Sequence, residues 1–127
     1  MRDQVDTLVR NLREELGEDL RGVFWGNFAI ETYTVAYIHE DVRAEYDSAT
    51  VADMVNVLVD EQLRSHGFDE LSHLLGEMEV TVRVFEQSTQ LMAWDPHTER
   101  GVFVAVTADE EDIPPTIRAL RELDFST

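Results

Sequence analysis

The strand-like run that ends at Val106 most constrains the fold, because both of its faces are apolar. Alternate residues of a β-strand point to opposite faces of a sheet. Val102, Val104 and Val106 therefore share one face, and Phe103 and Ala105 share the other. A sheet that contains such a strand needs cover on both sides, so the sequence predicts helices packed against both faces.

Four further segments have the alternation, or the β-branched and aromatic residues, that are typical of strands. They are Val23–Trp25, Tyr33–Ile38, Glu79–Phe85 and Gln90–Trp94. Gly26 and Asn27 interrupt the pattern after the first segment, which indicates a turn or a bulge there.

Helical periodicity appears at both ends of the chain. Apolar residues recur at helical spacing from Asp3 to Leu16, with Asp3 as the expected N-cap and Gly17 as the stop. At the other end, a proline pair at 114 and 115 opens a last helix. Its apolar residues are Ile117, Leu120 and Leu123.

Two more helices are expected in the middle of the chain. The longer one starts after Thr50 as its N-cap and ends near His66, where Gly67 supplies the stop. A short helix follows through Leu71, Leu74 and Leu75. The predicted fold class is therefore α+β: one domain over 1–127, with a five-stranded antiparallel sheet and helices on both faces, in the order α-β-β-α-(α)-β-β-β-α.

The net charge of the chain limits the classes of molecule that it is expected to bind. It has 127 residues, 27 of them acidic and 10 basic, for a net charge of −17, and every basic residue is an arginine. Binding of phosphate backbones needs clustered Lys and Arg. Nucleic acid and anionic membranes are therefore disfavoured as partners.

The acidity has three candidate origins: an acidic tail, a surface that mimics nucleic acid or recruits a basic partner, and adaptation to a very salty cytoplasm. Successive quarters of the chain hold seven, seven, six and seven acidic residues. An even coat suits molar salt, where the Debye length is about 3 Å and repulsion is screened. The distribution favours salt adaptation. Without a secretory signal pattern or a long apolar run, we expect a soluble cytoplasmic protein.

Few residue patterns in the chain indicate a catalytic, cofactor or metal site. Without cysteine there are no disulfides, zinc–thiolate sites, Fe–S clusters or thiol catalysis, and without lysine there is no P-loop lysine or Schiff base. The histidines His39, His66, His73 and His97 lack metal-ligand spacing and are interpreted as polar residues near loops. Asp95 with His97 is interpreted as an Asp-Pro turn rather than a cation site. The acidic run 109–112 is interpreted as a solvated loop before the last helix. We therefore expect no catalytic, cofactor or metal site.

The predicted central helix has more apolar surface than one-sided packing needs. At about 100° per residue, its apolar side chains span about 240° of the circumference. A helix on one sheet face needs a stripe little wider than 100°. Either the neighbouring short helix or a second copy of the protein must cover the surplus. The apolar residues concerned are Val51, Met54, Val55, Val57, Leu58, Val59 and Leu63.

This order of elements resembles the roadblock/light-chain fold, which is related to profilin-like and longin domains. In roadblock-like proteins the corresponding helix and the following strand form a dimer interface. The resemblance thus implies a homodimer, with a small GTPase or a cytoskeletal or signalling component as its protein partner. The implied interface residues are Met54, Val57, Leu58, Val59, Val80, Val82 and Val84.

Three short runs resemble segments of a family of small acidic haloarchaeal proteins. The runs are Leu20–Val23, Tyr37–Val42 and Thr81–Glu86. This resemblance supports the salt-adapted habitat and adds no chemistry.

Two functional hypotheses follow. The first is a non-enzymatic homodimeric scaffold or regulatory protein that binds another protein. The second is a sensor that binds a small ligand between sheet and helices, near Trp25, Tyr37, Met92 and Trp94. A hydrolase or transferase is disfavoured, because no nucleophile–base arrangement is visible.

Overall fold

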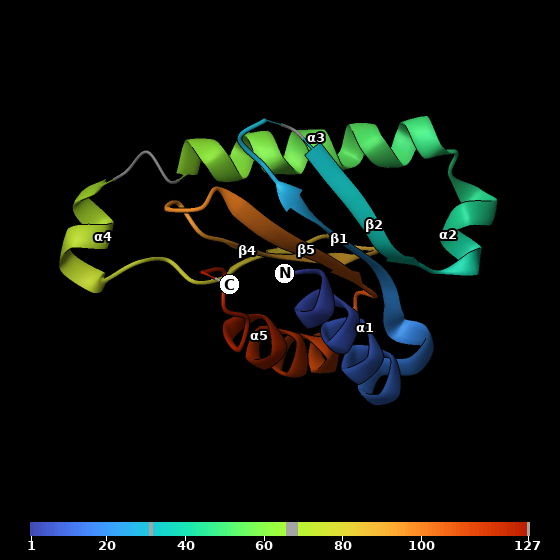
Figure 1. The fold of residues 1–127 in the computed structure, drawn as a ribbon. Coiled ribbons are helices and arrows are strands. Elements are labelled where there is room, and N and C mark those ends of the chain that lie inside the picture. The colour runs from blue at the N-terminus through green and yellow to red at the C-terminus, as the bar shows by residue number, and fades with distance from the viewer. Residues whose placement is uncertain (31, 66–68, 127) are drawn as a thin grey trace.

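A computed structural model describes residues 1–30, 32–65 and 69–126. Its described part is an α+β fold built on a five-stranded antiparallel sheet with the strand order β2-β1-β5-β4-β3, which confirms the predicted fold class. Strands β2 and β3 form the two edges of the sheet (Figure 1). The strands are β1 (Leu20–Asn27), β2 (Thr32–Ile38), β3 (Thr81–Val84), β4 (Thr89–Trp94) and β5 (Arg100–Val106).

Helices cover both faces of the sheet, as expected from the two-sided apolar pattern of β5. Helices α1 (Arg2–Leu16) and α5 (Ile113–Arg121) lie on one face, and α3 (Ser48–Ser65) lies on the other (Figure 1). The short α2 (Glu40–Glu45) joins β2 to α3, and α4 (Asp69–Leu75) lies beyond the other end of α3. None of the described helices is both long and apolar enough to span a bilayer.

The sheet separates two hydrophobic cores. Valines of β5 at 102, 104 and 106 pack with α1 and α5, whereas Phe103 packs with α3. This is the alternation predicted for the strand. The α3 side is built from the buried residues Phe24, Phe28, Val51, Val55, Val59, Met92 and Phe103.

Two predicted helix caps are wrong, each for a local reason. Helix α1 starts at Arg2 with Met1 as its N-cap, so Asp3 lies in the first turn rather than at the cap. Helix α3 starts before Thr50, because Asp47 Oδ1 accepts a hydrogen bond from the Thr50 backbone N–H at 2.8 Å. This bond holds the pKa of Asp47 below its ordinary value. The predicted stop at residues 66 and 67 lies outside the described residues.

Gly26 lies inside β1 rather than in a turn, and the bulge occurs between Val23 and Phe24. A Cβ at position 26 would lie 1.9 Å from the Thr32 carbonyl oxygen of β2. The close approach of the two strand backbones therefore explains the glycine.

Candidate functional site

The predicted interface residues of α3 divide between its outer and inner sides. Val57 and Met54 are exposed, with 58% and 44% of their surfaces accessible. Leu58 is half-buried, and Val59 is fully buried against the sheet. Two of the four helical residues thus have substantial surface to offer a partner, and Val59 has none.

The predicted interface residues of β3 show a similar division. Val84 is 63% exposed at the end of the edge strand. Val80 and Val82 are partly buried and pack against the core on the α1 and α5 side. Of the seven predicted residues, Met54, Val57 and Val84 are the exposed ones.

A polar contact joins α3 to the edge strand. Arg83 Nε of β3 lies 3.2 Å from Glu61 Oε2 of α3, and Arg83 Nη1 donates to Gln62 Oε1 at 3.4 Å. Val57 precedes Glu61 by one helical turn, so both lie on the flank of α3 that faces β3. Phe85 directly follows β3; it is 52% exposed, and its backbone N–H donates to the Ser88 carbonyl at 2.8 Å. The outer flank of α3 and the β3 edge therefore adjoin.

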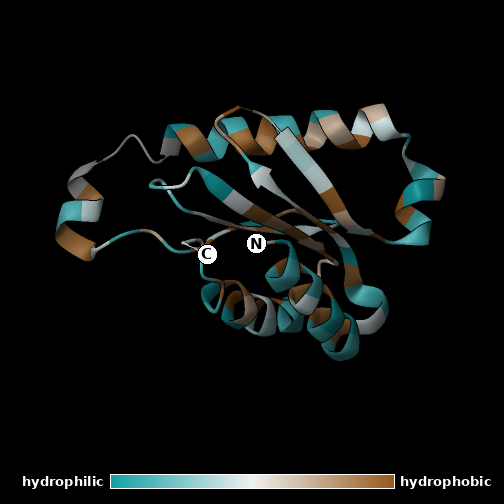
Figure 2. Cartoon of the chain, in the orientation of Figure 1, coloured by the Kyte–Doolittle hydropathy of each residue, from teal (hydrophilic) through white to brown (hydrophobic). Residues whose placement is uncertain are grey.

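Helix α4 does not cover this surface. Its leucines, Leu71, Leu74 and Leu75, are between 60% and 81% exposed. The helix stands away from the sheet, with apolar segments along its length (Figure 2). The explanation in which the short helix covers the surplus apolar surface of α3 is therefore wrong.

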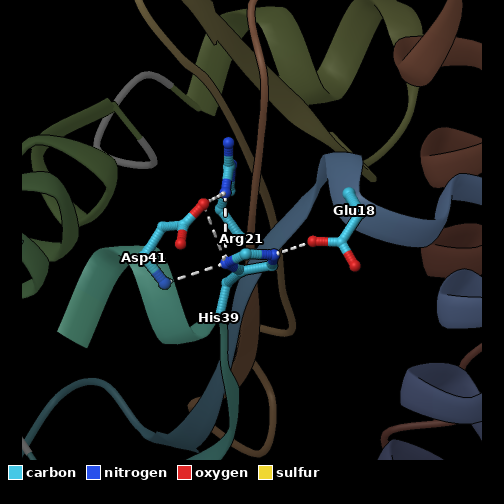
Figure 3. Close-up of polar contacts among 4 residues, drawn as sticks. All are labelled: Glu18, Arg21, His39 and Asp41. Carbon is cyan, nitrogen blue, oxygen red and sulfur yellow. Dashed lines mark hydrogen bonds and ion pairs between the residues drawn. The ribbon is translucent and has the colours of Figure 1, made fainter. Parts of the chain in front are cut away.

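A buried histidine organises the end of the sheet where α2 begins (Figure 3). His39 is 6% exposed, and its Nε2 lies 2.5 Å from Glu18 Oε2. Its Nδ1 accepts from the Asp41 backbone N–H at 3.0 Å, which makes His39 the N-cap of α2. Arg21 Nη1 lies 3.2 Å from the same nitrogen. These contacts fit a neutral ring with its proton on Nε2.

Sequence reasoning missed this role of His39. The residue was interpreted as a polar side chain near a loop, because histidine is not among the usual N-cap residues. Both of its ring nitrogens are engaged, so neither is free to act as a general base. The contacts of this cluster hold β1, the end of β2 and the start of α2 together.

The remaining described histidines lie at the surface. His97 Nε2 lies 3.0 Å from Glu77 Oε1, and both side chains are largely exposed. Asp95 accepts hydrogen bonds from the backbone N–H groups of His97 and Thr98, as expected for the predicted Asp-Pro turn. His73 is exposed on α4.

The acidic run before α5 contains one buried carboxylate. Oxygens of Asp112, Asp109 and Asp19 lie within 4.8 Å of one another. Burial raises the pKa of Asp112 to about 6; the Thr107 hydroxyl, which donates to its Oδ2 at 2.7 Å, opposes the rise, and Asp19 adds to it. The run is thus only partly the solvated loop that was predicted. Sequence gave no signal for Asp19, which lies 90 residues or more from the other two.

The aromatic residues predicted to line a ligand site lie on opposite faces of the sheet. Trp25 and Tyr37 pack on the α1 side, where Arg2 and Arg13 lie over their rings. Met92 and Trp94 pack on the α3 side. The predicted pocket between them is therefore wrong. A cavity of about 250 Å³ lies elsewhere, between α2, the first half of α3 and the sheet.

Comparison with known proteins gives a family without an activity. No curated protein and no solved structure matches the chain. These comparisons do not test the roadblock and haloarchaeal resemblances, which remain predictions. A family model described as a domain of unknown function, DUF7522, matches residues 6–123, nearly the whole of the fold described above. The chain therefore belongs to the DUF7522 family.

Proposed function

We propose that this protein is a non-enzymatic, homodimeric scaffold or regulatory protein that binds another protein in a salt-adapted cytoplasm. The observation that carries the proposal is where its exposed apolar side chains gather. Eight of the eleven large, exposed hydrophobic residues among those described lie between positions 54 and 85. They are Met54, Val57, Leu71, Leu74, Leu75, Met78, Val84 and Phe85. Met54, Val57, Val84 and Phe85 lie on α3 or at the β3 edge, whereas the three leucines belong to α4, which stands away from the sheet. Exposed apolar residues on α3 and at the adjoining β3 edge are typical of an interaction site.

The accessible area of the chain is larger than the average for its mass. The chain exposes 7796 Å² and has a mass of 14.6 kDa. A compact monomer of that mass is expected to expose about 6900 Å². The chain thus exposes about 900 Å² more than this average, and the protruding α4, whose leucines are between 60% and 81% exposed, contributes to the difference.

The exposed edge of β3 favours a second copy of this chain as the binding partner. An edge strand is commonly protected by a charged side chain. Here the side chain of Arg83 is directed to Glu61 and Gln62 of α3, and 18% of it is exposed. Arg83 therefore does not protect the β3 edge from pairing with another strand. Antiparallel pairing of two β3 edges about a two-fold axis would bring the exposed flanks of two α3 helices together. Val57 and Phe85 would then be buried in the interface.

The non-enzymatic part of the proposal is supported by the chemistry of the described residues. His39, the buried histidine among them, has both ring nitrogens occupied by Glu18, Arg21 and the Asp41 backbone. It serves to fix α2 on the sheet rather than to move a proton.

The test is the oligomeric state in 2 M KCl, measured by light scattering coupled to size exclusion. We expect the wild type to have twice the monomer mass and Val57→Asp to be monomeric at the same concentration. Val35→Asp is the matched control: Val35 is 53% exposed, and it lies on the opposite edge strand, β2. A monomeric wild type, or dissociation by Val35→Asp and not by Val57→Asp, would overturn the proposal.

A further inference from the structure

Helix α4 is a short apolar helix that receives little packing from the described part of its own chain. It has seven residues, and every residue from Leu71 to Glu79 is exposed. Its leucines, Leu71, Leu74 and Leu75, share one helical face and are between 60% and 81% exposed. Helices of this length are marginal in water unless an apolar face packs against another element. The leucine face of α4 therefore needs an apolar surface to pack against.

The cavity beside α2 offers such a surface, but at the opposite end of α3. Helices α2 and α4 lie at the two ends of α3 (Figure 1), so α4 is remote from the cavity of its own chain. Gln87 and Ser88, which follow β3, line the cavity, so it adjoins the β3 side of α3. Its apolar lining comes from the sheet, α2 and the first half of α3: Phe24, Phe103, Val42, Val51, Met54 and Val55.

The volume of the cavity matches the side chains of α4. The cavity measures about 250 Å³. An apolar cavity of about 150 Å³ holds one benzene ring, which has six carbon atoms. A leucine side chain has four carbon atoms, so the cavity has room for roughly two of the leucines of α4.

A two-fold axis beside Val57 brings α4 of one copy to the cavity of the other. Val57 lies near the middle of α3, which extends from Ser48 to Ser65. The axis makes the two α3 helices antiparallel, so residues that are equally far from Val57 lie opposite each other. Ser65 of one copy then lies opposite Ala49 of the second copy. Because α4 follows Ser65, it lies beyond Ala49, beside α2 and the cavity of the second copy.

On the basis of the proposed dimer, we propose that its two copies exchange their α4 helices. The leucines of each α4 pack into the cavity beside α2 of the other copy. The exchange gives α4 the packing that a seven-residue helix needs, and it covers the apolar lining of the cavity. The two contacts are related by the two-fold axis, so they close the assembly at two copies.

Single cysteines test the contact between chains, because the protein has no cysteine of its own. An affinity-tagged Leu74→Cys chain is mixed with an untagged Met54→Cys chain and oxidised with oxidised glutathione in 2 M KCl. We expect a disulfide between one tagged and one untagged chain, because Met54 lines the cavity. Val35→Cys replaces Met54→Cys in the control and should not link, since Val35 is similarly exposed but lies on β2. Equal yields with the two cysteines, in chains that light scattering shows to be dimeric, would overturn the exchange and leave the proposed dimer standing.

A charge on α4 should also weaken the dimer. Leu74→Asp places a carboxylate against the apolar lining of the cavity, so we expect the dissociation constant of the dimer to rise at least tenfold in sedimentation equilibrium. Ile30→Asp is the control and should leave the constant unchanged, since Ile30 is 69% exposed but precedes β2. An unchanged constant for Leu74→Asp, with Val57→Asp monomeric, would overturn the exchange alone. A monomeric wild type would overturn the proposed dimer and the exchange with it.

Discussion

Replacing Asp112 by asparagine should stabilise the protein at neutral pH and leave its stability almost unchanged near pH 4. Asp112 is 5% exposed, and its carboxyl group lies near those of Asp19 and Asp109. Asparagine has nearly the same shape and keeps an oxygen that accepts the hydrogen bond from the Thr107 hydroxyl. The substitution therefore removes the buried charge while it preserves the contact.

The sign and size of the effect follow from the pKa. Burial raises the pKa of Asp112 in the folded protein to about 6, from an ordinary value of 3.8. Well below pH 3.8 the carboxyl group is largely protonated in both states. As the pH rises from 4 to 6, the unfolded state ionises first, so the wild type loses the stability that the protonated carboxyl contributes. Above pH 6 the loss levels off at no more than about 3 kcal/mol, since one pKa unit corresponds to about 1.4 kcal/mol.

Urea unfolding at pH 4, 5, 6 and 8 in 2 M KCl measures this difference. The free energy of unfolding of Asp112→Asn should exceed that of the wild type by a margin that grows between pH 4 and 6. Asp60→Asn is the control, because Asp60 is exposed on α3 and its replacement changes the net charge equally. A margin that is the same at pH 4 and pH 8, or a variant that is less stable at pH 8, would refute the reasoning.

Two further predictions concern the histidine cluster and the surface charge. His39→Ala should lower the free energy of unfolding by about 1–3 kcal/mol, because the Asp41 N–H at the start of α2 loses its acceptor; His39→Asn keeps a capping oxygen and should recover part of the loss in urea unfolding. A cost below about 0.5 kcal/mol for His39→Ala would contradict the role of the cluster. Dialysis from 2 M to 20 mM KCl should lower the thermal midpoint and weaken the near-UV circular dichroism, because a net charge of −17 is then poorly screened. An unchanged spectrum and midpoint would count against salt adaptation.

The sheet and the main helices could be predicted because their periodic patterns are long. The two apolar faces of β5 and the stripe of α1 each extend over several residues, and burial on both sides of the sheet follows directly. Caps depend on single hydrogen bonds, so Asp47 could replace Thr50 without any change in periodicity. Helix α2 has six residues and no apolar stripe, and a histidine caps it. Its position, and hence the cavity beside it, could not be predicted from spacing alone.

The predicted interface residues of α3 also show that sequence spacing alone does not determine which side chains are exposed. Periodicity gave the width of the apolar arc on α3, but the rotation of the helix decides which part of the arc is covered. In the structure, Val51, Val55 and Val59 turn inward together with the polar Gln62, which is 1% exposed. Gln62 meets Arg83 of β3 there, a contact that no apolar pattern encodes. That rotation buries Val59 and leaves Val57 exposed.

The position of Val57 on α3 makes it a more specific test of the proposed dimer than Met54. Met54 is exposed on the outer flank of the helix, yet it also lines the cavity beside α2. A charge at Met54 would disturb both surfaces, and a loss of dimer could then arise through the cavity. Val57 does not line that cavity, and it lies one helical turn from Glu61, which holds the β3 edge. A charge at Val57 therefore acts on the flank that faces the proposed second copy and leaves the lining of the cavity unchanged.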